Sequence, residues 1–413
     1  MTDRWDESLA TGSFDLASPA DDRRVRDLAD VILTSQPTAE SLLQVAGDDT
    51  EPLDLRLAVV LARSRMLVQR LDWSGRVAVV FAMWGERRRL RPRDDSNPTG
   101  EDALHVKLDQ LAWLFAGSMV DWHLYAVDDG DPEDSAAVAQ ERADSHAHGD
   151  RVHVLRLADV MPATTGPLAG LSRTDDSRKG GAIVYGADVA LADGCDALVM
   201  TDADNSVNLA QLGLLLEPFT AGSGVVVGDR KHPSSVLVKA EARWGPGIVV
   251  LRHMQRMVGR ALFSQGLRDT QAAFKLYSAA ALGDILAAPS TFGFAFDSDW
   301  LYAAIGHGSA IESVPFAFID SFEESASITQ GPMTTWESLL RGLVDAARAR
   351  SVDHDTEMAA IIDEYADAAQ LDVVVQNAPD ELAHATDAEL GSRDLMTPEQ
   401  LGSWLEQLLH PPA

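Results

Sequence analysis

Short apolar runs alternate with stretches of helical periodicity from residue 76 to residue 228, and this alternation limits the possible folds more than any other feature. The apolar runs lie at 76–81, 122–127, 152–157, 197–200 and 224–228. Apolar residues at helical spacing fill 105–115, 134–148, 181–192 and 209–219 between the runs. Strands that alternate with helices usually pair in parallel and carry helices on both faces. The sequence therefore predicts an α/β fold with a mostly parallel sheet.

Two acidic turns follow predicted strands. Asp128-Asp129-Gly130-Asp131 comes after the second run, and Asp202-Ala203-Asp204 comes directly after the fourth. Ligands of such sheets bind beyond the carboxyl ends of the strands, where both turns are expected. Either turn by itself is also typical of a solvated loop.

The triplet Asp202-Ala203-Asp204 offers two carboxylates that are two residues apart. Mg²⁺ and Mn²⁺ prefer oxygen ligands and often use one or two carboxylates together with phosphate oxygens. Cleavage of a sugar–diphosphate bond builds negative charge on the diphosphate, and a bound cation can neutralise it. The triplet supplies such a site for Mn²⁺ or Mg²⁺, but taken alone it is a weak signal, because solvated turn acids commonly show the same pattern.

Charge and cysteine content exclude several other classes. The chain carries 64 acidic and 34 basic side chains, a net charge of −30, which disfavours nucleic acid and anionic membrane surfaces as partners. No stretch of about 18 apolar residues predicts a transmembrane segment, and residues 1–20 lack the pattern of a signal peptide. The single cysteine, Cys195, precludes an intrachain disulfide. We expect a cytoplasmic protein.

The pattern divides the chain into three parts. Residues 1–74 read as an acidic tail and a helical extension that packs on the main domain or forms a homodimer contact. Residues 75–335 carry the strand–helix alternation, and 336–413 read as a second helical extension. Helices are expected at 336–349, 358–371 and 397–409, with an acidic linker at 372–395.

Several segments occur in the order and spacing of a known family. They are Phe81-Ala82-Met83-Trp84-Gly85-Glu86, Val127-Asp128-Asp129-Gly130-Asp131, Arg178-Lys179-Gly180-Gly181-Ala182, Asp202-Ala203-Asp204, Gly228-Asp229-Arg230, Asp269-Thr270-Gln271-Ala272-Ala273-Phe274-Lys275-Leu276-Tyr277 and Phe294-Ala295-Phe296-Asp297-Ser298-Asp299. Together they resemble the family 2 glycosyltransferases of the GT-A fold, most closely the dolichyl-phosphate mannose and glucose synthase subgroup. The first segment keeps Glu86 but lacks the Pro, Tyr and Asn of the family's turn.

The resemblance implies a role for each matching position. Those implied to bind the donor are Ala82, Glu86, Asp128, Asp129, Lys179, Asp202, Ala203, Arg230 and Arg256. Asp202 and Asp204 are implied to hold the metal. The resemblance also implies that Gln271 lies near the reacting centre and that Asp297 and Asp299 face the acceptor.

Two of these assignments have alternatives. Sugar transfer to a hydroxyl needs a general base such as Asp297, whereas a phosphate acceptor does not. Asp297 or Ser298 could instead cap a helix. Arg252, Arg256 and Arg260 share one helix face, which suits either an electropositive ledge for an anionic ligand or a solvated stripe.

The expected function is hexosyl transfer, implied to be inverting, from a UDP- or GDP-sugar to a soluble small molecule or a polyprenyl phosphate. One alternative is a nucleotidyltransferase. Such an enzyme needs a glycine-rich basic loop after the first strand, and residues 82–87 match that pattern poorly. Another alternative is a non-catalytic homologue that only binds nucleotide-sugars.

Overall fold

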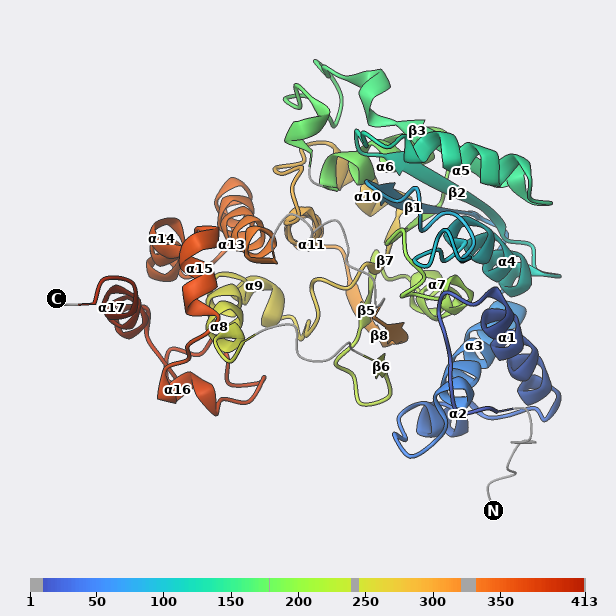
Figure 1. Cartoon of the computed structure of the whole chain (residues 1–413), viewed down its shortest axis with the longest axis horizontal. Helices are drawn as coiled ribbons and strands as arrows, with labels where there is room; N and C mark the ends of the chain where they lie inside the picture. Colours follow the sequence, from blue (N-terminus) through green and yellow to red (C-terminus); the bar gives the residue numbers. More distant parts are fainter. Residues whose placement is uncertain (1–9, 178, 239–244, 321–331, 412–413) are drawn as a thin grey trace.

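A seven-stranded, mostly parallel sheet forms the centre of the molecule in the computed structural model, which describes residues 10–177, 179–238, 245–320 and 332–411 (Figure 1). The strand order is β3-β2-β1-β4-β7-β5-β8, and only β7 runs antiparallel to its neighbours. The strands are β1 (Arg76–Met83), β2 (Asp121–Asp128), β3 (Val152–Arg156), β4 (Ala197–Thr201), β5 (Val225–Asp229), β7 (Phe274–Ser278) and β8 (Ile311–Pro315). The α/β fold predicted from the sequence is confirmed.

Helices follow the strands as the alternation predicted. The helices of the main domain are α4 (Ala103–Phe115), α5 (Ser135–Asp144), α6 (Gly180–Ala192), α7 (Gly213–Thr220), α8 (Ile248–Val258), α9 (Arg260–Phe263), α10 (Ala279–Leu286) and α11 (Phe296–Gly306). The short strands β6 (Val236–Val238) and β9 (Ala317–Ile319) form a separate parallel pair. The close approach of α6 to the sheet requires a glycine, because a Cβ on Gly186 would lie 2.7 Å from a methyl of Val80.

The two helical extensions complete opposite faces of the sheet. Alternate residues of β1 separate the faces: Val77 and Val79 pack with the N-terminal helices, whereas Ala78 and Val80 pack in the cluster that contains the C-terminal helices. Figure 1 shows the extensions on opposite sides of the molecule. The N-terminal helices are α1 (Pro19–Thr34), α2 (Ala39–Ala46) and α3 (Leu53–Arg70); the C-terminal helices are α13 (Pro332–Ala349), α14 (Thr356–Tyr365), α15 (Ala368–Val374), α16 (Asp380–Ala383) and α17 (Pro398–Leu409).

Some local predictions were wrong. The helix expected at 358–371 is two helices, because Asp367 caps α15 with its side chain and ends the run of α14. The expected linker at 372–395 contains α16, which packs against α8. Strand β7 was missed because it is antiparallel and lies outside the strand–helix alternation. Within the described residues, no helix is long and apolar enough to cross a membrane.

Candidate functional site

The acidic triplet lies at the carboxyl end of β4, at the middle of the sheet. Ala203 is buried in the core, with 6% of its surface exposed, so it anchors the turn between the two acids. The Asp202 side chain is 33% exposed and can meet a ligand. The Asp204 carboxylate accepts hydrogen bonds from the backbone N–H (3.1 Å) and the hydroxyl of Ser206 through one oxygen. The triplet therefore presents carboxylates at the sheet edge predicted from the sequence.

Lys179 connects the triplet to the end of β2. It directly precedes α6 with a left-handed φ of 71°, and its ammonium pairs with Asp202. Its backbone N–H donates to Asp129 at 2.8 Å. Burial would lower the pKa of Lys179, but Asp202 outweighs burial and the pKa is raised. The pKa of Asp202 is lowered for the same reason, since Lys179 outweighs the cost of burial.

The loop after β1 follows the strand that lies between β2 and β4. Ala82 pairs with Val127 in the sheet, and the carbonyl of Met83 accepts from the N–H of Asp129 at 2.9 Å. Glu86 is buried and forms an ion pair with Arg89. Burial raises the pKa of Glu86 to about 7 despite Arg89, and the charge of Asp204 adds to the rise. The effect of Asp204 places Glu86 within electrostatic range of the triplet.

Asp128 is engaged by its own turn. One carboxylate oxygen accepts from the backbone N–H groups of Gly130 (2.9 Å) and Asp131 (3.0 Å). The other accepts from the N–H of Ala136, in the first turn of α5, at 3.2 Å. These bonds shape the acidic turn and join it to α5. Asp128 thus shapes the turn, whereas the buried Asp129 joins the turn to Lys179.

Arg230 and the buried Asp269 form a bidentate ion pair beside the triplet. The guanidinium donates to the carboxylate at 2.6 and 2.8 Å, and the backbone N–H of Arg230 donates to it at 3.2 Å. Burial would raise the pKa of Asp269, but Arg230 outweighs it and holds the pKa at about 2. Gln271 follows, and its amide donates to the hydroxyl of Ser298 at 3.3 Å. The Asp269 to Tyr277 segment thereby fixes a cation near Asp202.

Asp297 is buried against a lysine. Its carboxylate lies 3.0 Å from the ammonium of Lys275, which is fully buried. Burial raises the pKa of Asp297 although Lys275 and Lys179 act in the opposite direction. Since Lys179 and Asp202 both influence Asp297, the three groups lie in one electrostatic cluster. Asp297 does not cap α11, whose N-cap is Ala295 and receives no side-chain bond, so the helix-cap alternative is wrong.

The sequence of this chain is similar to those of two mannosyl-transferring proteins. No model of a known protein family matches this chain. It is 29% identical to the polyprenol monophosphomannose synthase of Mycolicibacterium smegmatis over 232 residues, which is 55% of this chain and 79% of the relative. It is also 29% identical to the undecaprenyl-phosphate mannosyltransferase of Micrococcus luteus over 195 residues, 47% of this chain and 70% of the relative. Both similarities support the resemblance to the family 2 glycosyltransferases, among them the polyprenyl-phosphate mannose synthases.

A solved structure gives a more distant similarity. The glucosyl-3-phosphoglycerate synthase of Mycobacterium tuberculosis is 15% identical, with 71% of this chain and 85% of that chain covered and a TM-score of 0.43. At this distance the likeness adds nothing to the assignment of the glycosyltransferase.

Two implied site residues of the glycosyltransferase are placed elsewhere. Asp299 is fully buried and accepts from Ser290 (2.6 and 3.0 Å) and from the guanidinium of Arg350 (2.8 and 3.1 Å). All four bonds go to its two carboxylate oxygens, so we drop Asp299 as a group that faces the acceptor. Arg256 pairs at 2.6 Å with Asp387 of the C-terminal extension, and its guanidinium lies over the ring of Phe263. This correction makes Arg256 a tether for the extension instead of a free donor ligand.

Two further residues, Lys107 and Trp84, lie near the glycosyltransferase site and were not predicted from the sequence. Lys107 of α4 is fully buried, and its ammonium donates to the backbone carbonyl of Asp204. Its position in an apolar helical pattern gave no signal, because the partner is 97 residues away. Trp84 directly follows β1 and is 37% exposed. An exposed tryptophan beside Glu86 at the ligand edge of the sheet is a recognisable signal.

Asp202 and Asp204 fit a cation that also takes phosphate oxygens. Among the described residues, no group of three or more His, Cys, Asp or Glu side chains could hold a metal ion alone. Mn²⁺ and Mg²⁺ at phosphate-transfer sites commonly take one or two carboxylates and complete their shell with phosphate and water. The ammonium of Lys179 already holds a positive charge against Asp202. The donor set therefore fits a metal bound together with a diphosphate.

Proposed function

We propose that this glycosyltransferase moves a hexose from a UDP- or GDP-sugar to an acceptor by inverting displacement. The observation that carries the proposal is the triplet Asp202-Ala203-Asp204 at the carboxyl end of β4, with Lys179, Arg230 and Asp297 in electrostatic contact with it. The relatives named for mannosyl transfer support the same reaction class.

Each proposed role follows from the position of the side chain. Asp202 and Asp204 hold Mn²⁺ or Mg²⁺, which supplies charge neutralisation for the departing diphosphate. Lys179 and Arg230 are cations that can bind phosphate oxygens. Glu86 and Asp129 lie at the ends of β1 and β2, where the base and ribose of a nucleotide are expected.

The role of Asp297 depends on the acceptor. If the acceptor is the hydroxyl of a soluble small molecule, a base must take its proton, and the raised pKa of Asp297 suits that transfer. If the acceptor is a polyprenyl phosphate, as the names of both relatives suggest, the attacking oxygen is already ionised. We propose the phosphate class first, because it is the class that the relatives share.

We also propose that residues 75–335 form the catalytic unit and that neither extension is an independent domain. Each extension shares a continuous apolar core with one face of the sheet. A segment that has no core of its own is expected to unfold together with the domain that covers it.

Thermal denaturation tests the proposal. A ligand that binds only the folded state raises the midpoint, so UDP- or GDP-sugars should raise Tm and should do so more with Mn²⁺. Asp204→Ala should lose the metal-dependent part of the shift. Asp196→Ala is the matched control, since Asp196 precedes the opposite end of β4 and binds the N–H of Arg76 at 2.7 Å. No shift with any nucleotide-sugar would contradict the proposal.

A further inference from the structure

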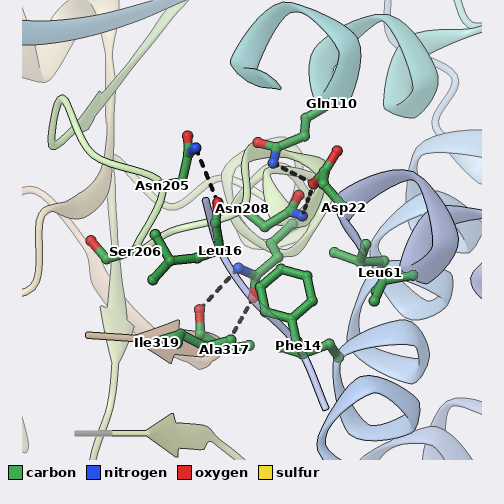
Figure 2. A pocket seen from close by; sticks show the side chains of 13 residues that line it. Phe14, Leu16, Asp22, Leu61, Gln110, Asn205, Ser206, Asn208, Ala317 and Ile319 are labelled. Atoms are coloured by element: carbon green, nitrogen blue, oxygen red, sulfur yellow. Dashed lines mark hydrogen bonds between the residues drawn. The ribbon is translucent and has the colours of Figure 1, made fainter. Parts of the chain in front are cut away.

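Asn205, which directly follows the triplet Asp202-Ala203-Asp204, is hydrogen-bonded to the N-terminal segment of the protein. Asn205 is 7% exposed, and its side-chain amide donates to the carbonyl of Leu16 at 3.3 Å (Figure 2). The same amide donates to the carbonyl of Glu101 at 3.0 Å. Its backbone N–H donates to the carboxylate of Glu101 at 2.9 Å. Asn205 is thus fixed from two sides, by the N-terminal segment and by the loop before α4.

The same turn also receives a hydrogen bond from a buried lysine. Lys107 of α4 donates to the carbonyl of Asp204, and its carbon chain is fully buried. Glu101 contacts Arg89 at 3.1 Å as well as Asn205, so the support continues to the loop after β1. The carbonyl and the N–H of the Asp204–Asn205 peptide are therefore both hydrogen-bonded, to Lys107 and to Glu101.

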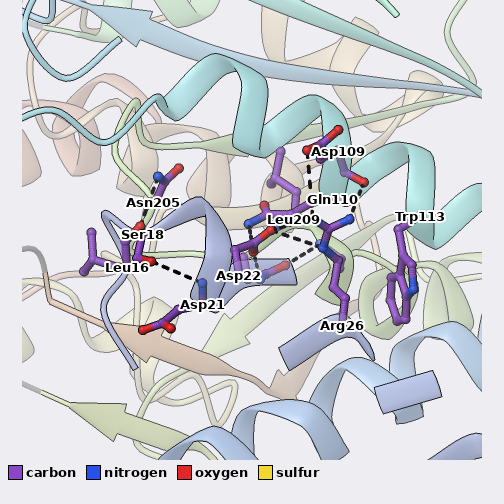
Figure 3. A network of polar contacts seen from close by, with 12 residues as sticks. Leu16, Ser18, Asp21, Asp22, Arg26, Asp109, Gln110, Trp113, Asn205 and Leu209 are labelled. Atoms are coloured by element: carbon purple, nitrogen blue, oxygen red, sulfur yellow. Dashed lines mark hydrogen bonds and ion pairs between the residues drawn. The ribbon is translucent and has the colours of Figure 1, made fainter. Parts of the chain in front are cut away.

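A second set of bonds fixes the N-terminal segment in place. Asp22 of α1 is 2% exposed and accepts from Gln110 of α4 at 2.7 Å and from Asn208 at 2.9 Å. Arg26 pairs with the same carboxylate at 2.9 Å (Figure 3). Gln110 in turn accepts from the N–H of Leu209 at 2.8 Å. The helix α1 is therefore joined to α4 and to the chain just beyond the triplet.

The contact between the segment and the turn leaves little free space. A cavity of about 20 Å³ lies between them, enough for one water-sized molecule (Figure 2). It is lined on one side by Phe14, Leu16 and Asp22 and on the other by Asn205 and Ser206. Movement of the N-terminal segment would therefore be transmitted to the turn through direct contacts.

We propose that Asn205 is a positioning residue and that the N-terminal extension, acting through Leu16 and Asn205, sets the affinity of the triplet for the metal–diphosphate. This proposal rests on the proposed function of the site. A carboxylate ligand that is already held in place loses less freedom when the cation binds. Partners that orient metal ligands typically contribute about 10–100-fold in metal affinity.

The test uses the full-length chain, Mn²⁺ and the nucleotide-sugar that stabilises the wild type most. The measured quantity is the Mn²⁺ concentration that gives half of the nucleotide-dependent rise in Tm. Asn205→Ala should raise this concentration about 10-fold or more. Activity of the variant should recover as Mn²⁺ is raised, because the metal position is weakened and not removed. Should Asn205→Ala fail to fold, Asn205→Ser carries the same expectation.

Trp113→Phe is the matched control. Trp113 of α4 donates to Asp30 of α1 at 3.0 Å. The change therefore removes one hydrogen bond between α1 and α4 and leaves the contacts of the triplet unchanged. The control should keep the wild-type Mn²⁺ concentration to within about twofold. An unchanged Mn²⁺ concentration in both Asn205 variants would overturn the proposal. Loss of Mn²⁺-dependent stabilisation in the wild type would instead contradict the proposed function itself.

Discussion

Two fully buried lysines contact residues of the candidate site. Lys107 donates to the carbonyl of Asp204, and Lys275 pairs with Asp297. A buried charge without a partner costs several kcal/mol, so such residues stay where a fixed partner compensates them. The two lysines therefore hold the site carboxylates or their backbone at set positions.

Glu86 gives the protein a pH-dependent stability near neutrality. Its pKa is raised to about 7 by burial, whereas an exposed Glu titrates near 4.3. Between these values the unfolded chain binds fewer protons than the folded chain, so the free energy of unfolding falls as pH rises. Relative to Glu86→Gln, the wild type should lose about 2 kcal/mol between pH 5.5 and 8. Urea denaturation of both proteins at each pH measures the difference; parallel curves would contradict the assignment.

Trp84 is expected to stack on the nucleotide base. It is 37% exposed directly after β1, beside the acids expected to meet the nucleotide. Stacking of a base on an aromatic ring is worth about 1–3 kcal/mol, so Trp84→Ala should weaken UDP or GDP binding by about tenfold. Calorimetric titration measures the affinity. Met119→Ala, at a 62% exposed apolar position, is the control that should bind normally.

At the scale of elements, several ion pairs join the C-terminal extension to the main domain, and one of them involves a fully buried carboxylate. Asp299 in the first turn of α11 receives the guanidinium of Arg350, the residue directly after α13. Asp299 is 51 residues away from Arg350 in sequence, so no local pattern could disclose the contact. The pair gives Asp299 a structural role, whereas Asp297, two residues earlier in α11, lies in the electrostatic cluster of the site.

Variants of these two acids should separate stability from catalysis. Asp299→Asn removes the partner of a buried cation and should lower the free energy of unfolding by about 3 kcal/mol while the remaining folded enzyme keeps its kcat. Asp297→Asn should lower kcat by about 100-fold or more if the acceptor is a hydroxyl, and little if it is a phosphate. Denaturation and initial-rate assays of both proteins decide. A kcat loss confined to Asp299→Asn would reverse our assignment.

At the scale of the whole molecule, a strongly acidic envelope surrounds a site that contains cations. The net charge is −30, yet Lys179 and Arg230 lie beside Asp202 in the middle of the sheet edge. Long-range repulsion among surface acids opposes the compact state. Salt screens this repulsion, with a Debye length of about 10 Å at 0.1 M.

Salt should therefore stabilise this protein. Raising NaCl from about 0.02 to 0.5 M should raise Tm, because the acidic side chains outnumber the basic ones 64 to 34 and repulsion among them should fall more than the exposed ion pairs weaken. Calorimetric scans at constant pH measure the shift. A fall in Tm would mean that attractive pairs dominate the surface. NaCl and choline chloride should act alike, which separates screening from specific cation binding.

Much of the fold and part of the site could be predicted from the sequence. The strand ends at Asp128 and Thr201 follow from local apolar periodicity, and parallel pairing brings them to one edge. The predicted neighbours Lys179, Asp202 and Arg230 do lie in one cluster. Asp299 and Arg256 pair with Arg350 and Asp387 of the C-terminal extension, and no local pattern could disclose these partners.

The sequence by itself determined the α/β class, the position of the acidic triplet and the charge of the envelope, because these depend on local periodicity and composition. Only the tertiary structure decided which charges support the triplet. Lys107 meets Asp204 across a separation of 97 residues, and Asn205 meets Leu16 across 189. Such contacts form only when the N-terminal segment and α4 pack on one face of the sheet, and no pattern within one segment encodes them.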